Sequence, residues 1–209
     1  MGHMRSGLLL ADGAMSRVFF LLLAAVFILA GCAGRTGESA SSKTLAPLRP
    51  AMRWDFRPEA ALWTADTLAA LRAHGAALAA MEPGDIAEWC PAYPTAGPDD
   101  RRAFWAGLFS ALAKHESTWN PVAVGGGGRW IGLVQIDPRT ARGYDCEAQS
   151  SAALKDGSAN LSCAVRIAAS QVPKHGTIAG GMHDWGPFVS SAKRADMAAW
   201  TRRQAYCAG

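Results

Sequence analysis

Apolar residues recur at helical spacing along much of this 209-residue chain, most clearly between residues 98 and 116. Pro98 followed by Asp99 and Asp100 is typical of a helix start, because proline fits the first turn and acids favour the positive end of the helix dipole. Positions 105, 109, 112 and 116 share one face, which puts Glu116 on the apolar side. The pattern predicts a helix over 98–116, which Pro121 stops from continuing.

Residues 58–80 are rich in alanine, a strong helix former, and we expect one helix there that ends before Pro83-Gly84. A single helical turn is expected at 85–89. The residues that mark successive turns of one side of the longer helix are Leu62, Asp66, Ala69 and Ala73.

The second half of the chain predicts two further helices and a small β element. Ser158 is expected to cap a helix that runs through Val172, and Ser190 to Tyr206 form the last helix. Residues 130–136 have the aromatic and β-branched content of a short strand, between a glycine loop at 125–128 and a helical turn at 138–143. The chain is therefore predicted to be mostly α. The side chains expected to face the core from the helix after Ser158 are Leu161, Ala164, Val165, Ala168 and Val172.

The N-terminal segment has the pattern of an export signal. Arg17 precedes 13 apolar residues, Val18 to Ala30, which are too few to span a bilayer because a span needs ~20. Leu29-Ala30-Gly31-Cys32 resembles a bacterial lipobox, in which Cys32 would be lipidated and become the mature N-terminus. An ordinary signal peptide with an incidental cysteine, or a short buried helix, are the alternatives. We favour the lipoprotein, because the positive charge of Arg17, the length of the apolar run and the lipobox-like sequence all agree with it.

This interpretation divides the chain into a signal peptide at 1–31, a tether at 32–50 and one domain at 51–209. The tether is rich in Gly, Ser, Thr, Ala and Pro, without apolar periodicity, as flexible linkers are. The protein would face the periplasm as a monomer anchored in a membrane by lipid, and Ala33 after Cys32 is compatible with sorting to the outer membrane.

The net charge of the chain limits the kinds of molecule that it is expected to bind. Removing residues 1–31 takes away two of the 21 Lys and Arg and one of the 17 Asp and Glu, which leaves a net charge near +3. A mild positive balance suits an anionic polymer as a partner. The basic residues are too few and too scattered for nucleic-acid binding.

Four cysteines remain after Cys32, and an even number in an exported chain indicates two disulfides. Three pairings are possible. We favour Cys146 with Cys163, a local loop, and Cys90 with Cys207, which would join the start of the domain to its end. The sequence has no Cys-x-x-Cys, which argues against a zinc or redox site, and we expect neither a metal nor a cofactor.

Two motifs carry the candidate chemistry. The first runs from Glu116 to Pro121 and reads Glu-Ser-Thr-Trp-Asn-Pro, and the second runs from Gly132 to Ile136 and reads Gly-Leu-Val-Gln-Ile. Together they resemble the lytic transglycosylases of the soluble type, whose fold is similar to goose-type lysozyme. That family has Glu-Ser-x-x-Asn-Pro and Gly-Leu-Met-Gln-Ile, so this chain departs only at Val134. The resemblance covers roughly residues 98–190 and implies an α+β, lysozyme-like domain that cleaves peptidoglycan glycan strands.

Glu116 is the candidate catalytic residue. Glycosidic cleavage needs a proton donor, and burial against apolar walls can raise the pKa of a glutamate toward the working pH. By base rate a glutamate at a helix end is a solvated surface residue, and the motif resemblance decides for catalysis. The resemblance implies that Glu116 first donates a proton and then takes one from the 6-hydroxyl of the muramoyl residue, so that a 1,6-anhydro ring closes without water.

The other candidate substrate-binding residues are Ser117, Trp130, Gly132, Gln135, His183 and Trp185. Ser117 is as well suited to a local backbone bond as to glutamate or substrate. In the family, the glutamine that matches Gln135 lines the cleft. The family's third motif, Ala-Tyr-Asn, is replaced here by His183-Asp184-Trp185, and His183 could supply the polar contact of the missing tyrosine. Asn160 is expected to be structural, as a cap near a helix start.

Two alternatives remain open at this stage. One is a hydrolytic muramidase in which Asp137 or Asp184 holds a water molecule. The other is a peptidoglycan-binding lipoprotein without turnover, which the altered third motif keeps under consideration.

The lipid anchor can be tested directly. Cys32→Ala should leave the protein soluble or unprocessed, because the tether has no amphipathic face that could replace the lipid. Membrane fractionation of cells that express wild type and variant measures this. Unchanged membrane association of the variant would rule out lipidation at Cys32.

Overall fold

Helix α4 (Pro98–Ser117) is surrounded by other elements over most of its length. Every residue from Ala103 to Ala113 in it is buried. Small residues allow this close approach: a Cβ on Gly107 would lie 2.2 Å from the Tyr206 hydroxyl oxygen. The structure, a computed structural model, describes residues 49–208. Cys32 and the expected signal peptide lie outside the described residues.

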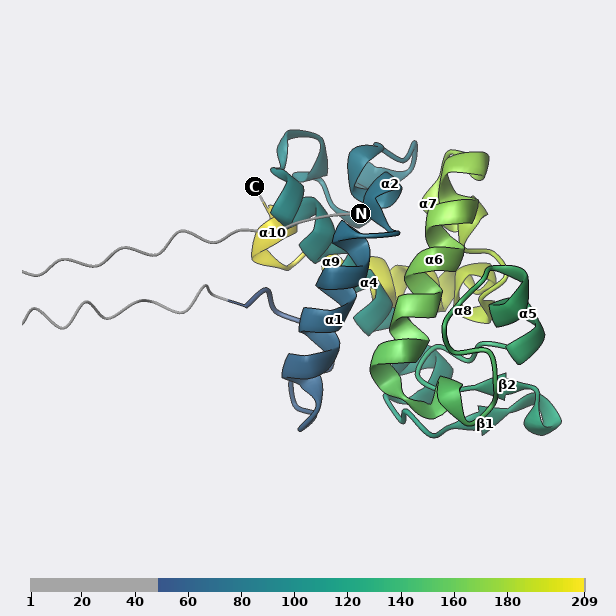
Figure 1. The fold of residues 1–209 in the computed structure, drawn as a ribbon. Helices are drawn as coiled ribbons and strands as arrows, with labels where there is room; N and C mark the ends of the chain where they lie inside the picture. Colours follow the sequence, from purple (N-terminus) through teal and green to yellow (C-terminus); the bar gives the residue numbers. More distant parts are fainter. Residues whose placement is uncertain (1–48, 209) are drawn as a thin grey trace, which may run out of the picture. The chain divides into compact units, whose positions relative to one another are not determined.

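The described residues are mostly helical, with one small antiparallel sheet, as predicted (Figure 1). Strands β1 (Val124–Gly125) and β2 (Trp130–Ile131) pair Val124 with Ile131. Three 3-10 turns lie at Tyr93–Thr95, Gly126–Gly128 and Ala153–Lys155. The remaining helices are α1 (Ala60–Arg72), α2 (Ala76–Ala80), α3 (Ile86–Trp89), α5 (Pro138–Gly143), α6 (Gly157–His175), α7 (Ile178–Gly181), α8 (Gly186–Val189), α9 (Ser191–Thr201) and α10 (Ala205–Ala208).

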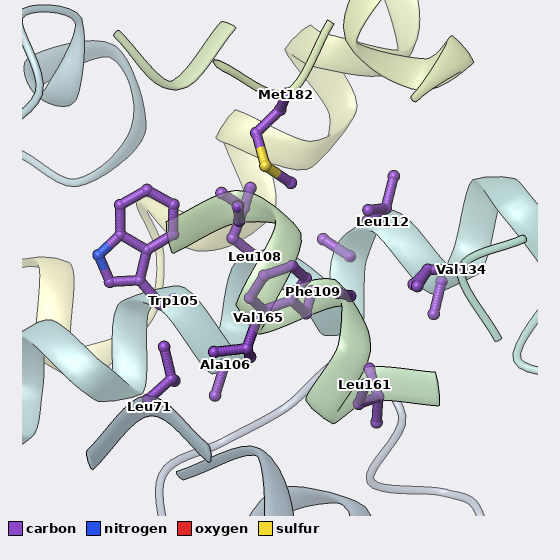
Figure 2. Close-up of a cluster of buried hydrophobic side chains, with 14 of the residues drawn as sticks. Leu71, Trp105, Ala106, Leu108, Phe109, Leu112, Val134, Leu161, Val165 and Met182 are labelled. Atoms are coloured by element: carbon purple, nitrogen blue, oxygen red, sulfur yellow. The ribbon is translucent and has the colours of Figure 1, made fainter. Parts of the chain in front are cut away.

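One hydrophobic core joins these elements, and Figure 2 shows its centre. The cluster includes Phe109 and Leu112 of α4, Leu161 and Val165 of α6, and Val134 of the loop after β2. The five residues of α6 that the sequence predicts to face inward are all buried. The core therefore holds the end of α4 and the loop after β2 in one packed unit.

The segment 58–80 is not one helix. The chain turns between Ala73 and Gly75, where a Cβ on Gly75 would lie 2.4 Å from the Val165 side chain, and α2 starts a new direction. The side marked by Leu62 and Ala69 faces solvent. The buried side of α1 consists instead of Ala60, Trp63, Thr64, Thr67, Ala70 and Leu71.

Three boundaries differ from the prediction. Asp156, not Ser158, caps α6, because its carboxylate accepts from the backbone N–H of Ala159. The expected last helix is divided into α9, which Ser190 caps, and α10. The strand expected at 130–136 ends at Ile131, because Gly132 and Gln135 have φ of +85° and +52° and turn the chain back. Within residues 49–208, none of the helices has the length and apolarity needed to cross a bilayer.

Both favoured disulfides are confirmed. Cys146 pairs with Cys163, 17 residues apart, and Cys90 pairs with Cys207, 117 residues apart. The second bond ties α3 to α10, which packs on α4.

Removing the long-range disulfide should cost more stability than removing the local one. The Cys90→Ala/Cys207→Ala variant should lose roughly 3–5 kcal/mol of unfolding free energy, and Cys146→Ala/Cys163→Ala about 3 kcal/mol or less, because a longer loop has more entropy in the unfolded chain. Denaturant unfolding of both variants beside wild type measures the two losses. A larger loss for the local pair would contradict this ranking.

Candidate active site

Glu116 lies in the last turn of α4, half-buried, where the helix ends abruptly. Thr118 and Trp119 both adopt left-handed backbone conformations, with φ of 52° and 56°. Such conformations are costly for residues other than glycine and persist when the surroundings enforce them. Here the Trp119 indole donates to the Ser110 carbonyl at 2.9 Å, and Phe56 packs edge-on against its ring. The turn after Glu116 is therefore fixed by side-chain contacts on both sides.

The second motif forms a tight turn that returns the chain to β2. Ile131 and Ile136 exchange both backbone hydrogen bonds, at 2.9 and 3.1 Å. Gly132 is required at the start of this turn, because a Cβ there would lie 2.3 Å from the Leu154 carbonyl oxygen at positive φ. The neighbours of Gly132 are therefore Leu154 of a 3-10 turn and Asn160 at the start of α6.

Ser117 joins the two motifs. Its hydroxyl lies 2.7 Å from the Leu133 carbonyl oxygen of the second motif, and 3.2 Å from the Ala113 carbonyl oxygen in its own helix. The backbone alternative weighed for Ser117 is therefore the one that the structure shows, with a partner 16 residues away. The hydrogen bond fixes the position of Glu116 relative to the turn.

Asn160 has a larger role than the expected helix cap. Its side chain is fully buried in the first turn of α6, accepts from the Val134 N–H, and donates to the Ile131 and Leu154 carbonyls, each at 3.0 Å. The Trp185 indole adds a bond of 2.9 Å to the Val134 carbonyl. Sequence reasoning identified Asn160 as structural but missed these partners, because they are 6 to 29 residues away from it along the chain.

A pocket of about 300 Å³ lies beside the second motif. Gln135, Trp130 and Trp185 all contribute to its wall, while Glu116 does not line it. Gln135 donates to the Gly132 carbonyl at 2.9 Å, so its amide is held by the turn. The other lining residues are Arg129, Ile136, Asp137, Thr140, Tyr144, Ile167 and Asp184.

Trp130, Trp185 and His183, three of the candidate substrate-binding residues, differ in how far they are free to contact a ligand. Trp130 is 42% exposed, but the Arg129 guanidinium lies over its ring at 4.9 Å. Trp185 is 7% exposed and belongs mainly to the core. His183 is exposed, bonds to the Gly180 carbonyl at 2.6 Å and lies 3.1 Å from Asp184. Because His183 neither lines the pocket nor bonds to Glu116, it does not replace the missing tyrosine contact.

Burial raises the pKa of Glu116 to about 7, and the positive charge of Lys193 opposes this rise. In the part of the chain that the structure describes, no side chain or backbone group hydrogen-bonds the Glu116 carboxyl. A carboxyl in this state is protonated for a large fraction of the time at neutral pH, and can both give and take a proton.

Sequence reasoning missed a charged cluster next to Glu116. The Asp196 carboxylate of α9 contacts Arg53, Lys114 and His115 at 2.6, 3.2 and 2.7 Å. Hydrogen bonds from Arg53, His115 and Lys114 hold the pKa of Asp196 well below its usual range. Residues 53, 114 and 196 are too far apart in sequence for any spacing rule to have found the cluster.

The other titratable candidates have partners of their own. Asp137 caps α5, accepting from the Arg139 N–H at 2.8 Å, and the Arg139 side chain also binds its carboxylate, which lowers the pKa of Asp137. Across residues 49–208, no group of three or more His, Cys, Asp or Glu side chains could hold a metal ion.

Comparison with known proteins agrees with this geometry. Residues 96–186, which include both motifs and Asn160, match the family model of the transglycosylase SLT domain. No curated protein matches the chain.

Among solved structures, wild-type Bd0314 DslA is similar, with 24% identity and a TM-score of 0.69 over 76% of this chain and 98% of that chain. Two mutants of DslA in which a glutamate is replaced by glutamine match similarly, with TM-scores of 0.69 and 0.67 at 23% and 24% identity. They cover 76% and 73% of this chain and 98% and 94% of the respective DslA chains. At this identity, the likeness shows that the fold is shared.

The raised pKa of Glu116 predicts how stability depends on pH. Between the unfolded value of ~4.3 and about 7, the native state binds more protons than the unfolded state, so wild type should lose stability as pH rises through this window. Glu116→Gln lacks this titration and should be the more stable protein at pH 8, by roughly 1–3 kcal/mol after allowance for partial exposure. Urea unfolding of both proteins at pH 4.5 and 8 measures the difference. Parallel pH dependence of the two would contradict the burial of this carboxyl.

Proposed function

The chain contains a transglycosylase SLT domain, the catalytic domain of peptidoglycan lytic transglycosylases, and we propose that Glu116 is its single acid–base group. The bond cleaved is the β-1,4 linkage between N-acetylmuramic acid and N-acetylglucosamine, with formation of 1,6-anhydro ends. The observation that carries the proposal is the half-buried Glu116 carboxyl, which has a pKa of about 7 and lies where the two motifs meet.

Glu116 can carry out both proton transfers of the reaction. Protonated Glu116 gives its proton to the glycosidic oxygen as the C1–O4 bond breaks, and the substrate's N-acetyl oxygen supports the positive charge that develops at C1. The Glu116 carboxylate then takes the proton of the muramoyl 6-hydroxyl, and O6 bonds to C1. Glu116 ends as it began, and no water is consumed. A pKa near neutrality suits a group that must act in both directions.

The state of the other carboxylates favours this mechanism over hydrolysis. A hydrolytic muramidase would use a second carboxylate to hold water. Asp137 is occupied by Arg139 and by its helix cap, and Asp184 lies 3.1 Å from the His183 ring. Glu116 is the acid whose surroundings favour the neutral form.

The location that we propose follows from the sequence. Lipidation at Cys32 would anchor the domain to a membrane, probed by the variant described above, and export would place it in the periplasm with access to the glycan. The domain has two disulfides, which persist in oxidising compartments such as the periplasm and are therefore consistent with export.

Replacing the acid should remove turnover and leave the fold intact. Glu116→Gln keeps the size and polarity of the side chain but cannot transfer a proton, so release of muropeptides from purified sacculi should fall by ~10² or more. Glu147→Gln makes the same chemical change at an exposed position and serves as the control. Mass spectrometry of the products distinguishes the possible activities.

Wild type should release anhydro-muropeptides. Reducing-end products, heavier by one water molecule, would replace the proposed reaction with hydrolysis. No release by wild type would indicate a binding protein, and equal release by Glu116→Gln and wild type would exclude Glu116 as the acid.

A further inference from the structure

Arg129 is the positively charged residue in the wall of the pocket beside the second motif, among the residues that the structure describes. It lies between the 3-10 turn Gly126–Gly128 and β2, and its side chain is 56% exposed. The negatively charged residues of the same wall are Asp137 and Asp184. The partners of these three side chains decide which charge the pocket offers to a ligand.

The Arg129 guanidinium is held in place by Trp130. Its central carbon lies 4.9 Å from the centre of the Trp130 ring, at the distance of a cation–π contact. The ring in turn packs on the glycine loop, where a Cβ on Gly126 would lie 2.5 Å from it. Because a guanidinium that is already oriented loses little freedom on binding, Arg129 is preorganised for a planar partner.

Protein groups engage the charge of Arg129 only weakly. Its Nε lies 3.7 Å from Asp137 Oδ2, which is too long for a hydrogen bond, and within residues 49–208 its guanidinium donates to no protein acceptor. Asp137 instead accepts from the backbone N–H and from the side chain of Arg139, each at 2.8 Å. One carboxylate between two guanidiniums leaves one positive charge in surplus, and the donors of Arg129 are free to meet a ligand.

Asp184 does not take up this surplus. Its side chain is 74% exposed and lies 3.1 Å from the His183 ring, and in the described part of the chain it forms no ion pair with Arg129. Water and salt screen such an exposed carboxylate strongly. The side of the pocket formed by Arg129 therefore favours an anion.

The pocket is connected to the acid through the second motif. Gln135 and Ile136 line the pocket, and Leu133 of the same turn accepts from Ser117, the residue after Glu116. Glu116 itself does not line the pocket. A substrate whose glycosidic bond lies at Glu116 would therefore present to the pocket a neighbouring group, and not the bond that breaks.

The substrate of the proposed reaction carries carboxylates beside that bond. Its sugar rings and N-acetyl groups are neutral, whereas the lactyl group of each muramoyl unit either ends in a carboxylate or bears a peptide stem that contains carboxylates. A guanidinium binds a carboxylate through two parallel N–H···O bonds, and an ether, a hydroxyl or an amide does not offer two such oxygens.

We propose that Arg129 is a specificity-determining residue that binds a carboxylate attached to the muramoyl unit, either the free lactyl carboxylate or one of the peptide stem, while the glycan lies at Glu116. The inference rests on the proposed function, because it takes the peptidoglycan glycan as the substrate. It assigns the charge of this pocket to recognition and leaves proton transfer to Glu116.

Ligand binding to the full chain carrying Glu116→Gln tests this without turnover. Calorimetric titration would use three soluble oligosaccharides of equal length: muramoyl glycan with peptide stems, stem-free muramoyl glycan with free lactyl carboxylates, and a chitin oligosaccharide, which has neither group. Adding Arg129→Gln should weaken binding of a carboxylate-bearing glycan roughly 10-fold or more, as expected for hydrogen bonds to a charged group. Binding of the chitin oligosaccharide should change by less than about twofold, because it has no carboxylate.

The glycan that shows the loss identifies the carboxylate, because attachment of a stem converts the lactyl carboxylate to an amide. A loss with the stemmed glycan alone indicates a stem carboxylate, a loss with the stem-free glycan alone indicates the lactyl group, and a loss with both means that Arg129 accepts either. Arg129→Lys keeps the charge without the planar fork and should recover only part of the affinity. Arg203→Gln removes an exposed charge after α9 and should leave all three affinities unchanged.

Unchanged affinity of the Arg129→Gln protein for both muramoyl glycans would overturn the proposal. An equal loss for all three ligands would also overturn it, because Arg129 would then only support Trp130 as a surface for sugar rings. The same holds if the protein with Arg129 intact binds neither muramoyl glycan more tightly than the chitin oligosaccharide.

The binding result is separate from the proposed reaction. If wild type releases no anhydro-muropeptides but the carboxylate-dependent loss is observed, recognition by Arg129 stands and the proposed reaction fails. If wild type releases them and the affinities coincide, only the role of Arg129 is wrong.

Discussion

The backbone between Ile131 and Val134 is buried, and a buried polar group without a partner would cost about as much as a lost hydrogen bond. The partners come from three distant places: Ser117 at the end of α4, Asn160 in α6 and Trp185 before α8. Because these side chains belong to different elements, their bonds also hold α4 and α6 against the second motif. The position of Glu116 depends on this set of bonds.

The packing around the end of α4 also raises the pKa of Glu116. Leu112 is one turn before Glu116 in α4, and Leu133 and Val134 of the turn are fully buried beside the helix end. Apolar walls on this side disfavour the charged form of the carboxyl, which raises its pKa. Stability and function therefore oppose each other at this residue. Ionisation of Glu116 lowers the free energy of unfolding, but the proposed reaction requires the ionised form.

Charge around Glu116 is distributed unevenly. Asp196 binds Arg53 from the segment before α1 and Lys114 and His115 from α4, whereas Lys193 is the cation whose charge opposes the rise in the pKa of Glu116. Arg129, by contrast, lies over Trp130 and 3.7 Å from Asp137 at the rim of the pocket. The electrostatic surroundings of the acid and of the pocket are thus set by different arginine and lysine residues.

The sequence by itself determined the elements whose causes are local. The helix start at Pro98, the apolar face of α4 that ends at Glu116, the inward face of α6 and the mostly helical fold all follow from spacing within about twenty residues. The two motifs pointed to Glu116 as the acid that we propose, and the even cysteine count with the expected export signal predicted the two disulfides. Tertiary structure alone decided where α1 breaks, since the close approach of Val165 at Gly75 cannot be seen in an alanine-rich segment. It also decided that the segment after Ile131 is a turn, that Asn160 bonds to that turn and that Asp196 binds three basic side chains. These interactions join residues between 6 and 143 positions apart and depend on how the helices pack.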